Sequence, residues 1–158
     1  MFKKQKLILI LLIFCFWQAT FSQVKETKRG RYALFFDGEF AFSLDEDTFA
    51  MAGLHTGDEL EEWQIHDLQT KSDTRKAVDK AMDLLALRDH AAGELYQKLC
   101  RSFDPHSAAA AVAKMQELNL LDDAGFARRR AAELLRKRKS RRAILDDLHA
   151  KGIDRGAA

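Results

Sequence analysis

The sequence predicts a mainly α-helical protein in which tandem three-helix repeats form an elongated array, preceded by a small N-terminal β-hairpin and further helices. Three observations predict this class. Aromatic segments flank an Asp-Gly pair, apolar residues recur at helical spacing from Ser43 onward, and a pattern of helices recurs after about fifty residues. The chain has 158 residues, 47% of them hydrophobic and 32% charged, which suits one domain or a small domain with an appendage.

An N-terminal targeting segment is predicted at Met1–Ser22. Three lysines precede an unbroken apolar run, Leu7–Trp17, and a short stretch of small, polar and aromatic residues follows it. This is the order of a secretory signal peptide, and the run is shorter than the ~20 residues that a bilayer-spanning helix needs. A buried or anchoring helix is the alternative. We exclude this segment from the fold prediction; cleavage near Ser22 would leave Cys100 as the one cysteine.

Residues 30–73 are predicted to form an acidic module with one β-hairpin. Asp37-Gly38 is a two-residue turn signal, because both turn positions favour positive φ, and the predicted strands are Tyr32–Phe36 and Glu39–Ser43. A lone hairpin is marginally stable, so we expect the face that carries Phe40 and Phe42 to lie on a helix.

Two helices are predicted in the rest of this module. Ser43–Glu46 resembles a capping box, and Gly53 is the stop signal of that helix. Thr56 or Asp58 is the expected cap of the next helix, which carries Leu60, Trp63, Ile65 and Leu68. Between Asp37 and Asp73 there are eleven acidic residues and one lysine, and helix capping is the favoured interpretation of the acidic run at Asp45.

Five amphipathic helices are predicted in two units after residue 73. The first three-helix repeat, 74–123, holds helices at Lys76–Leu87, at Ala92–Leu99 and from Asp104-Pro105 to Leu118. The second repeat, 124–158, holds helices at about Ala124–Lys139, capped by Asp122 or Asp123, and at Arg141–Ala150, capped by Ser140. This second repeat is expected to be incomplete, because the chain stops before a third helix.

The repeat is predicted from three matching blocks in the same order. Ala81–Arg88 matches Ala131–Arg138, Glu94–Leu99 matches Ala143–Leu148, and Phe103-Asp104 matches Ile153-Asp154. Amphipathic helices resemble one another through their leucine spacing, which is the alternative explanation. The common order and the matching loop ends favour a true repeat.

A cluster of nine cations between Arg128 and Arg142 is the candidate binding site. It comprises Arg128, Arg129, Arg130, Arg136, Lys137, Arg138, Lys139, Arg141 and Arg142. On a continuous helix these residues form a broad stripe, and Glu133 is the one acidic residue within it. Such a stripe can neutralise phosphates or meet an acidic protein groove, and a solvated helix face is the alternative. No aromatic residue lies between the cations, which argues against base stacking.

No residue pattern indicates an enzyme. The five histidines have no zinc-type spacing, and phosphate-binding and nucleophile-elbow motifs are absent, so we expect no metal and no cofactor. Cys100 follows Leu99 on an apolar helix face and is expected to be a buried free thiol.

Several segments resemble the RecX family of bacterial recombination regulators. The resemblance covers about 30–153, and the junction that reads Leu-Leu-Asp-Asp followed by Phe126-Ala127 is its most specific part. The matching segments are Ala81–Arg88, Glu94–Leu99, Leu118–Ala127 and Ser140–Ile153, and the hairpin Tyr32–Ser43 resembles an N-terminal extension of some members.

The resemblance implies a monomeric cytoplasmic protein that binds the RecA filament on single-stranded DNA through phosphate contacts. Such a protein modulates, and usually inhibits, the ATPase and strand exchange of RecA, within DNA repair and the SOS response, without catalytic chemistry of its own. The chain departs from the family pattern in three places: the third helical unit is absent and the second is incomplete, the turn at Arg101–Phe103 is one residue short, and an export-type segment stands at the N-terminus. Two alternatives remain: an exported helical interaction protein without a nucleic-acid role, and a truncated fragment without function.

Overall fold

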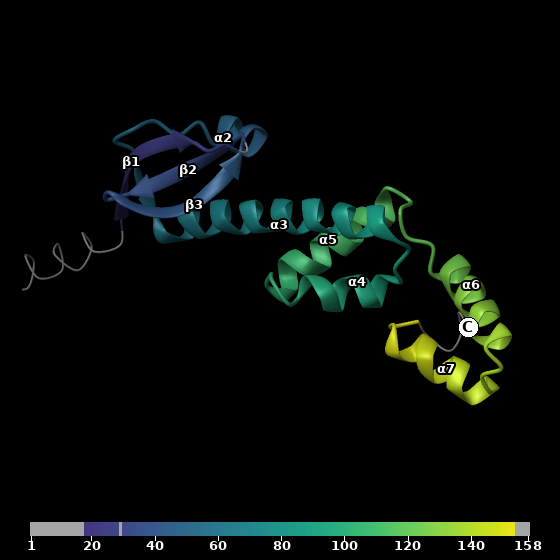
Figure 1. The fold of residues 1–158 in the computed structure, drawn as a ribbon. Coiled ribbons are helices and arrows are strands. Elements are labelled where there is room, and N and C mark those ends of the chain that lie inside the picture. Colours follow the sequence, from purple (N-terminus) through teal and green to yellow (C-terminus); the bar gives the residue numbers. More distant parts are fainter. Residues whose placement is uncertain (1–17, 29, 154–158) are drawn as a thin grey trace, which may run out of the picture. The chain divides into compact units, whose positions relative to one another are not determined.

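The computed structural model describes residues 18–28 and 30–153, which belong to two compact units, Met1–Ser72 and Asp73–Ala158 (Figure 1). The described part of the first unit is a small antiparallel sheet with two helices. That of the second unit is entirely helical. The mainly helical fold with an N-terminal sheet is therefore confirmed, whereas the tandem repeats and their boundaries remain predictions.

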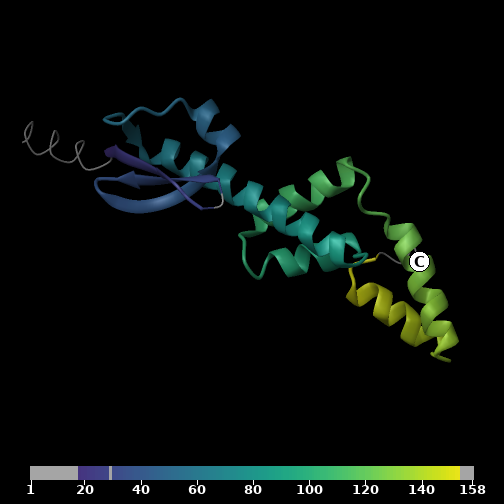
Figure 2. The same ribbon diagram turned by 45° about the horizontal axis from the view of Figure 1, so that its top comes forward.

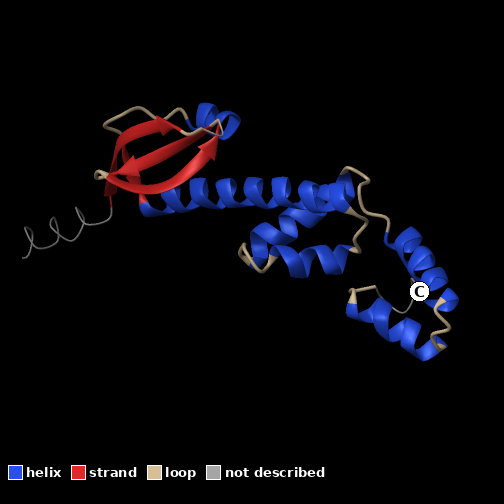
Figure 3. Ribbon diagram, viewed as in Figure 1, coloured by secondary structure: helices blue, strands red, loops and turns tan. Residues whose placement is uncertain are grey.

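The sheet of the first unit has four strands in the order β3-β2-β1-β4 (Figure 3). The strands are β1 (Gln18–Glu26), β2 (Arg31–Phe36), β3 (Glu39–Asp45) and β4 (Glu59–Glu61). The predicted hairpin is confirmed as β2 and β3, and the φ angles of Asp37 and Gly38, 50° and 85°, are those of the expected turn. Strands β1 and β4 were not predicted.

Strand β1 does not support a targeting segment that ends at Ser22. Met1–Trp17 lie outside the described residues, but Gln18–Ser22 begin β1 and pair there with β4 and β2. Phe21 is 1% exposed, and its ring lies 5.7 Å from that of Phe36. Cleavage near Ser22 would remove Phe21 from this core. None of the helices within residues 18–28 and 30–153 combines the length and apolar character that crossing a bilayer requires.

The core of the first unit lies between the sheet and helical residues that follow it. Helix α2 (Glu46–Ala52) begins at Asp45, whose carboxylate accepts a hydrogen bond from the Thr48 amide at 3.1 Å, so Ser43 is not the cap. The buried cluster comprises Phe21, Leu34, Phe36, Phe42, Leu44, Leu60 and Leu68. Phe40 does not share the face of Phe42: the β2–β3 register shifts at Ala41, which has no partner in β2, and Phe40 is 61% exposed.

One long helix, α3 (Glu62–Leu87), replaces the two helices predicted over this region. Leu60 lies in β4, so the predicted helix begins later than its apolar pattern indicated. No glycine or proline occurs between Asp58 and Leu87, and no residue type therefore interrupts the helix. Ser72 is buried on α3 and donates a hydrogen bond to the carbonyl of Ser43 at 2.5 Å.

The second unit contains two apolar clusters formed by successive helices. Its helices are the remainder of α3, α4 (Ala92–Leu99), α5 (Pro105–Glu117), α6 (Asp123–Arg136) and α7 (Arg141–Ala150). One cluster joins α3, α4 and α5, and the other joins α6 and α7 with Ala91 and Ile153. Asp104, Asp122 and Ser140 cap α5, α6 and α7 through hydrogen bonds to backbone amides, as predicted. Cys100 is exposed at the end of α4, so the prediction of a buried thiol is wrong.

Candidate functional site

The basic cluster is divided between two helices and the turn that joins them. Arg128, Arg129, Arg130 and Arg136 lie on α6, Arg141 and Arg142 lie on α7, and Lys137, Arg138 and Lys139 form the connection. Figure 2 shows α6 and α7 side by side with this turn at one end. The helix breaks at Lys137, so the single helical stripe expected for residues 128–142 is wrong.

The break is a Schellman motif centred on Arg138. Its φ of 54° is left-handed, and the Arg138 and Lys139 amides donate to the carbonyls of Leu135 and Leu134 at 2.8 and 3.0 Å. The same motif ends α5 at Asn119 and α7 at Gly152. Glycine is the usual residue at this position, and a side chain with a Cβ costs roughly 1 kcal/mol there. Arg138 therefore lowers the free energy of unfolding relative to a glycine at this position.

Three members of the basic cluster are neutralised within the protein. Arg130 forms two 2.9 Å hydrogen bonds to Asp147 and one to Glu133, and Glu133 also pairs with Lys137. Arg129 pairs with Asp89 at 2.7 Å. Hydrogen bonds from Arg130 hold the pKa of Asp147 below its usual value. Glu133 is the one acidic residue within 128–142, but Asp89 and Asp147, which are distant in sequence, also neutralise members of the cluster.

The other six cations are exposed and have no ion pair with any residue of the described ranges. They are Arg128, Arg136, Arg138, Lys139, Arg141 and Arg142, hereafter the unpaired cations. Five of them lie within seven residues of one another around the α6–α7 turn. This concentration of uncompensated positive charge can neutralise successive phosphates or carboxylates on a partner.

Contacts with α4 hold the end of α7 and thereby position part of this surface. A Cβ built on Gly93 would lie 2.6 Å from the Cα of Gly152, so the two backbones touch. Beside them the Glu94 carboxylate accepts hydrogen bonds or ion pairs from Arg88 at 2.7 Å and Lys151 at 3.3 Å. The Asp123 carboxylate also accepts from the Ala92 amide at 2.8 Å. The α6–α7 pair is thus fixed to α4 at both of these points.

Glu94 makes the stability of the second unit dependent on pH. Burial alone would raise its pKa, but hydrogen bonds and charges from Arg88 and Lys151 outweigh burial and lower the pKa from 4.5 to about 2. Because the folded pKa is the lower one, this stabilisation is complete above pH 4.5 and is lost as the pH falls towards 2. We expect Glu94→Gln to destabilise the protein near neutral pH, and this penalty to shrink by about 1–2 kcal/mol near pH 3.

Urea unfolding of wild type and variant at the two pH values measures this change. Glu117→Gln is the matched control, because its carboxylate is exposed and pairs with Lys114 alone. A Glu94→Gln penalty that is the same at both pH values would contradict the assignment.

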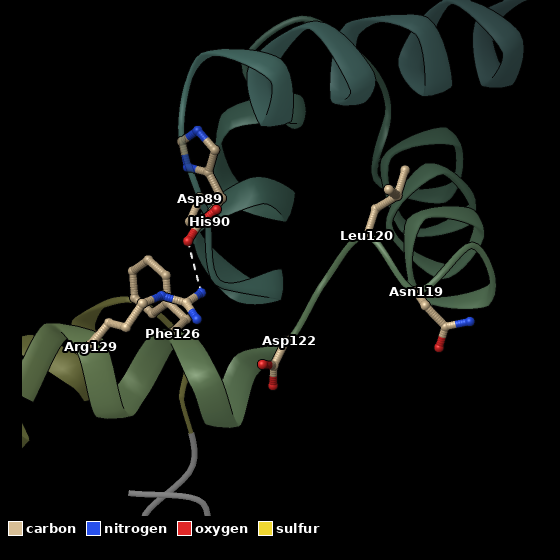
Figure 4. Close-up of a pocket in the computed structure, with 7 residues that line it drawn as sticks. All are labelled: Asp89, His90, Asn119, Leu120, Asp122, Phe126 and Arg129. Carbon is tan, nitrogen blue, oxygen red and sulfur yellow. Dashed lines mark hydrogen bonds and ion pairs between the residues drawn. The ribbon is translucent and has the colours of Figure 1, made fainter.

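A cavity of about 450 Å³ lies beside the basic cluster, between the end of α3, the α5–α6 loop and α6 (Figure 4). The Asp89–Arg129 ion pair crosses its wall, and Phe126 lies next to that pair. His90 also lines it; burial, followed by the charges of Arg88 and Lys98, lowers the pKa of His90. Within the described ranges, no group of three acidic, histidine or cysteine side chains is placed to hold a metal ion.

The sequence did not reveal the residues that neutralise and position the cluster. Asp89 lies forty positions from Arg129 and Asp147 seventeen from Arg130. Of these residues, the sequence pointed only to Glu94, because Glu94 is the first residue of a segment that recurs in the predicted repeat. No local spacing signals the other pairs, since they depend on how α6 packs against its neighbours.

The structure is that of a mainly helical protein with a small N-terminal sheet and a basic helical hairpin, α6–α7. Comparison with known proteins finds relatives that are regulatory proteins RecX. Regulatory protein RecX of Caldanaerobacter subterraneus subsp. tengcongensis is 29% identical over 133 residues, 84% of this chain and 68% of the relative. Regulatory protein RecX of Lactobacillus delbrueckii subsp. bulgaricus is 35% identical over 139 residues, 86% of this chain and 51% of the relative.

A solved structure shares the fold. The crystal structure of a regulatory protein RecX aligns with a TM-score of 0.63 and 25% identity, over 88% of this chain and 70% of that one. No protein-family model matches the chain. The chain is therefore similar to RecX regulatory proteins in sequence and in fold. It spans about half the length of several of the curated relatives it matches.

Proposed function

We propose that this chain regulates the RecA recombinase by binding its filament on single-stranded DNA, and that it inhibits ATP hydrolysis and strand exchange. The similarity in sequence and fold to regulatory proteins RecX is the observation that carries the proposal. The protein acts as a monomer in the cytoplasm, needs no cofactor and performs no bond chemistry of its own.

The unpaired cations are the proposed contact surface. Six exposed positive side chains that form no ion pair in the described part of the chain release counterions when they meet phosphates, which favours binding at low salt. The absence of aromatic residues from 128–142 leaves the bases without a stacking partner there, so the contact is independent of DNA sequence. The left-handed Arg138 supports this role, because a charged residue occupies a position where glycine would be more stable.

Inhibition follows from differential binding. A ligand shifts an equilibrium only by as much as it prefers one state over the other. A chain that binds one conformation of the filament, or the surface that receives the next subunit, lowers ATP turnover without touching the nucleotide.

The proposal is tested by titrating the full chain into RecA filaments on single-stranded DNA while following ATP hydrolysis. We expect a saturable decrease in the rate that weakens as salt rises. An unchanged rate, together with failure to co-sediment with the filament in dilute buffer, would contradict the proposal.

A further inference from the structure

We propose that Arg129 is a further phosphate contact of the basic cluster, and that the Asp89 carboxylate restrains it by competing for its guanidinium group. The inference rests on the proposed function in one respect, because it takes a nucleic-acid backbone as the ligand of the cluster. The restraining residue lies outside 128–142, on the connection between α3 and α4.

The ion pair between Arg129 and Asp89 is open to solvent (Figure 4). The two side chains are 60% and 68% exposed. Nη2 of Arg129 donates to Oδ2 of Asp89 at 2.7 Å, whereas Nε and Nη1 have no hydrogen-bond partner within residues 18–28 and 30–153. An exposed pair of this kind gains little, because water solvates both charges when they separate. A ligand can therefore take over the guanidinium group without breaking a buried contact.

The neighbouring Arg130 is held far more firmly. Its Nε and Nη2 donate to the two carboxylate oxygens of Asp147 at 2.9 Å, and its Nη1 donates to Glu133 at the same distance. The side chains of Arg130 and Asp147 are each 28% exposed. A phosphate would have to displace three charged hydrogen bonds there, and such bonds are the strong ones. Exchange of partners is therefore expected at Arg129 and not at Arg130.

The first turn of α6 leaves room for the Arg129 side chain. A Cβ built on Gly125 would clash with the Asp122 carboxylate and would lie 3.0 Å from Nη1 of Arg129. Gly125 lies within a helix, where alanine is the better residue, so the space left for these two side chains accounts for the glycine. Arg129 also follows Arg128, one of the unpaired cations, so a released Arg129 would extend that surface.

Binding of a nucleic-acid backbone favours the exchange. A guanidinium group forms hydrogen bonds to phosphate as readily as to carboxylate. Phosphates attracted by Arg128 and its neighbours also raise the local concentration of anions beside Arg129. After the exchange the Asp89 carboxylate stays near the phosphates and repels them. Asp89 therefore lowers the affinity in two ways, by holding Arg129 in the free protein and by its own charge in the complex.

The test is binding of the full chain to a labelled single-stranded oligonucleotide of thymidines, followed by fluorescence anisotropy at several salt concentrations. We expect Asp89→Asn to tighten binding by about two- to fivefold, because it removes the competing charge and preserves the size of the side chain. Asp89→Glu keeps the charge and should bind like wild type. Adding Arg129→Gln to Asp89→Asn should abolish the gain and reduce the slope of log affinity against log salt by about 0.7.

Asp79→Asn is the matched control, because it makes the same change in charge and releases Arg75 from an exposed ion pair on α3. It should leave oligonucleotide binding unchanged. Equal affinities of wild type and Asp89→Asn, or an equal gain from Asp79→Asn, would overturn the proposal. Absence of binding by both wild type and Asp89→Asn in dilute buffer would also overturn it.

Inhibition of RecA by the same variants separates this inference from the proposed function. Oligonucleotide binding that Asp89→Asn does not strengthen, together with inhibition of ATP hydrolysis by wild type, rejects the restraint by Asp89 and leaves the proposed function intact. Strengthened oligonucleotide binding without inhibition by wild type or Asp89→Asn supports the restraint and contradicts the proposed function.

Discussion

Replacing Arg136, Arg138 and Arg142 with glutamate is expected to reduce affinity for the RecA–DNA filament by at least about tenfold at moderate salt. All three side chains are exposed and have no ion pair within residues 18–28 and 30–153, so their loss breaks none of the ion pairs found there. Three lost phosphate contacts should also reduce the slope of log affinity against log salt by about 2. Inhibition of ATP hydrolysis, titrated at several salt concentrations, measures both quantities.

The matched control reverses three exposed cations elsewhere: Lys28, Lys80 and Arg101. Both variants change the net charge equally, so a general electrostatic effect would weaken them alike. Equal losses in the two variants, or no loss in the first, would assign the contact to another surface.

Arg138→Gly separates binding from stability. Glycine relieves the left-handed strain, so we expect a gain of up to about 1 kcal/mol in the free energy of unfolding. The same change removes one of the unpaired cations and should weaken filament binding. A variant that is more stable and also fully inhibitory would show that the charge at this position has no role in binding.

Local signals in the sequence predicted several of the turns and caps of this fold. Asp37-Gly38 identified the hairpin, and Asp104 and Ser140 identified the starts of α5 and α7, because each of these residues acts through its own backbone or that of its near neighbours. The concentration of Arg and Lys residues between Arg128 and Arg142 likewise predicted where the unpaired cations lie along the chain. These features depend on interactions within a few residues.

Features that depend on distant residues were missed. Strand β1 forms through its pairing with β2 and β4, which lie further along the chain. The sequence instead indicates a targeting segment over Met1–Ser22, which overlaps the first five residues of β1. The neutralisation of Arg129 and Arg130 requires Asp89 and Asp147, which come from other helices. The division of the basic cluster into paired and unpaired members therefore needed the structure.

Gly93→Ala is expected to destabilise the second unit by about 3 kcal/mol, at the upper end of the usual cost of overpacking. In an open helix this substitution would stabilise by up to about 1 kcal/mol, so a loss would reverse the intrinsic preference. The reason is that the added Cβ lies 2.6 Å from the Cα of Gly152 and 2.9 Å from the carbonyl of Lys151, and backbone atoms on both sides cannot rotate away. Urea unfolding measures the loss, and amide exchange in α7 locates it.

Two glycine controls separate the clash from backbone strain. Gly53→Ala meets no atom within 4 Å and suffers only the positive φ of 59°, so it should cost about 1 kcal/mol. Gly152→Ala combines a positive φ with a 2.7 Å approach to Gly93 and should cost more than either. Because α7 carries Arg141 and Arg142, both substitutions at the contact should also weaken filament binding, whereas Gly53→Ala should not. If Gly93→Ala were as stable as wild type, α7 would not be held by the backbone contact with α4, and the position assigned to these two cations would be wrong.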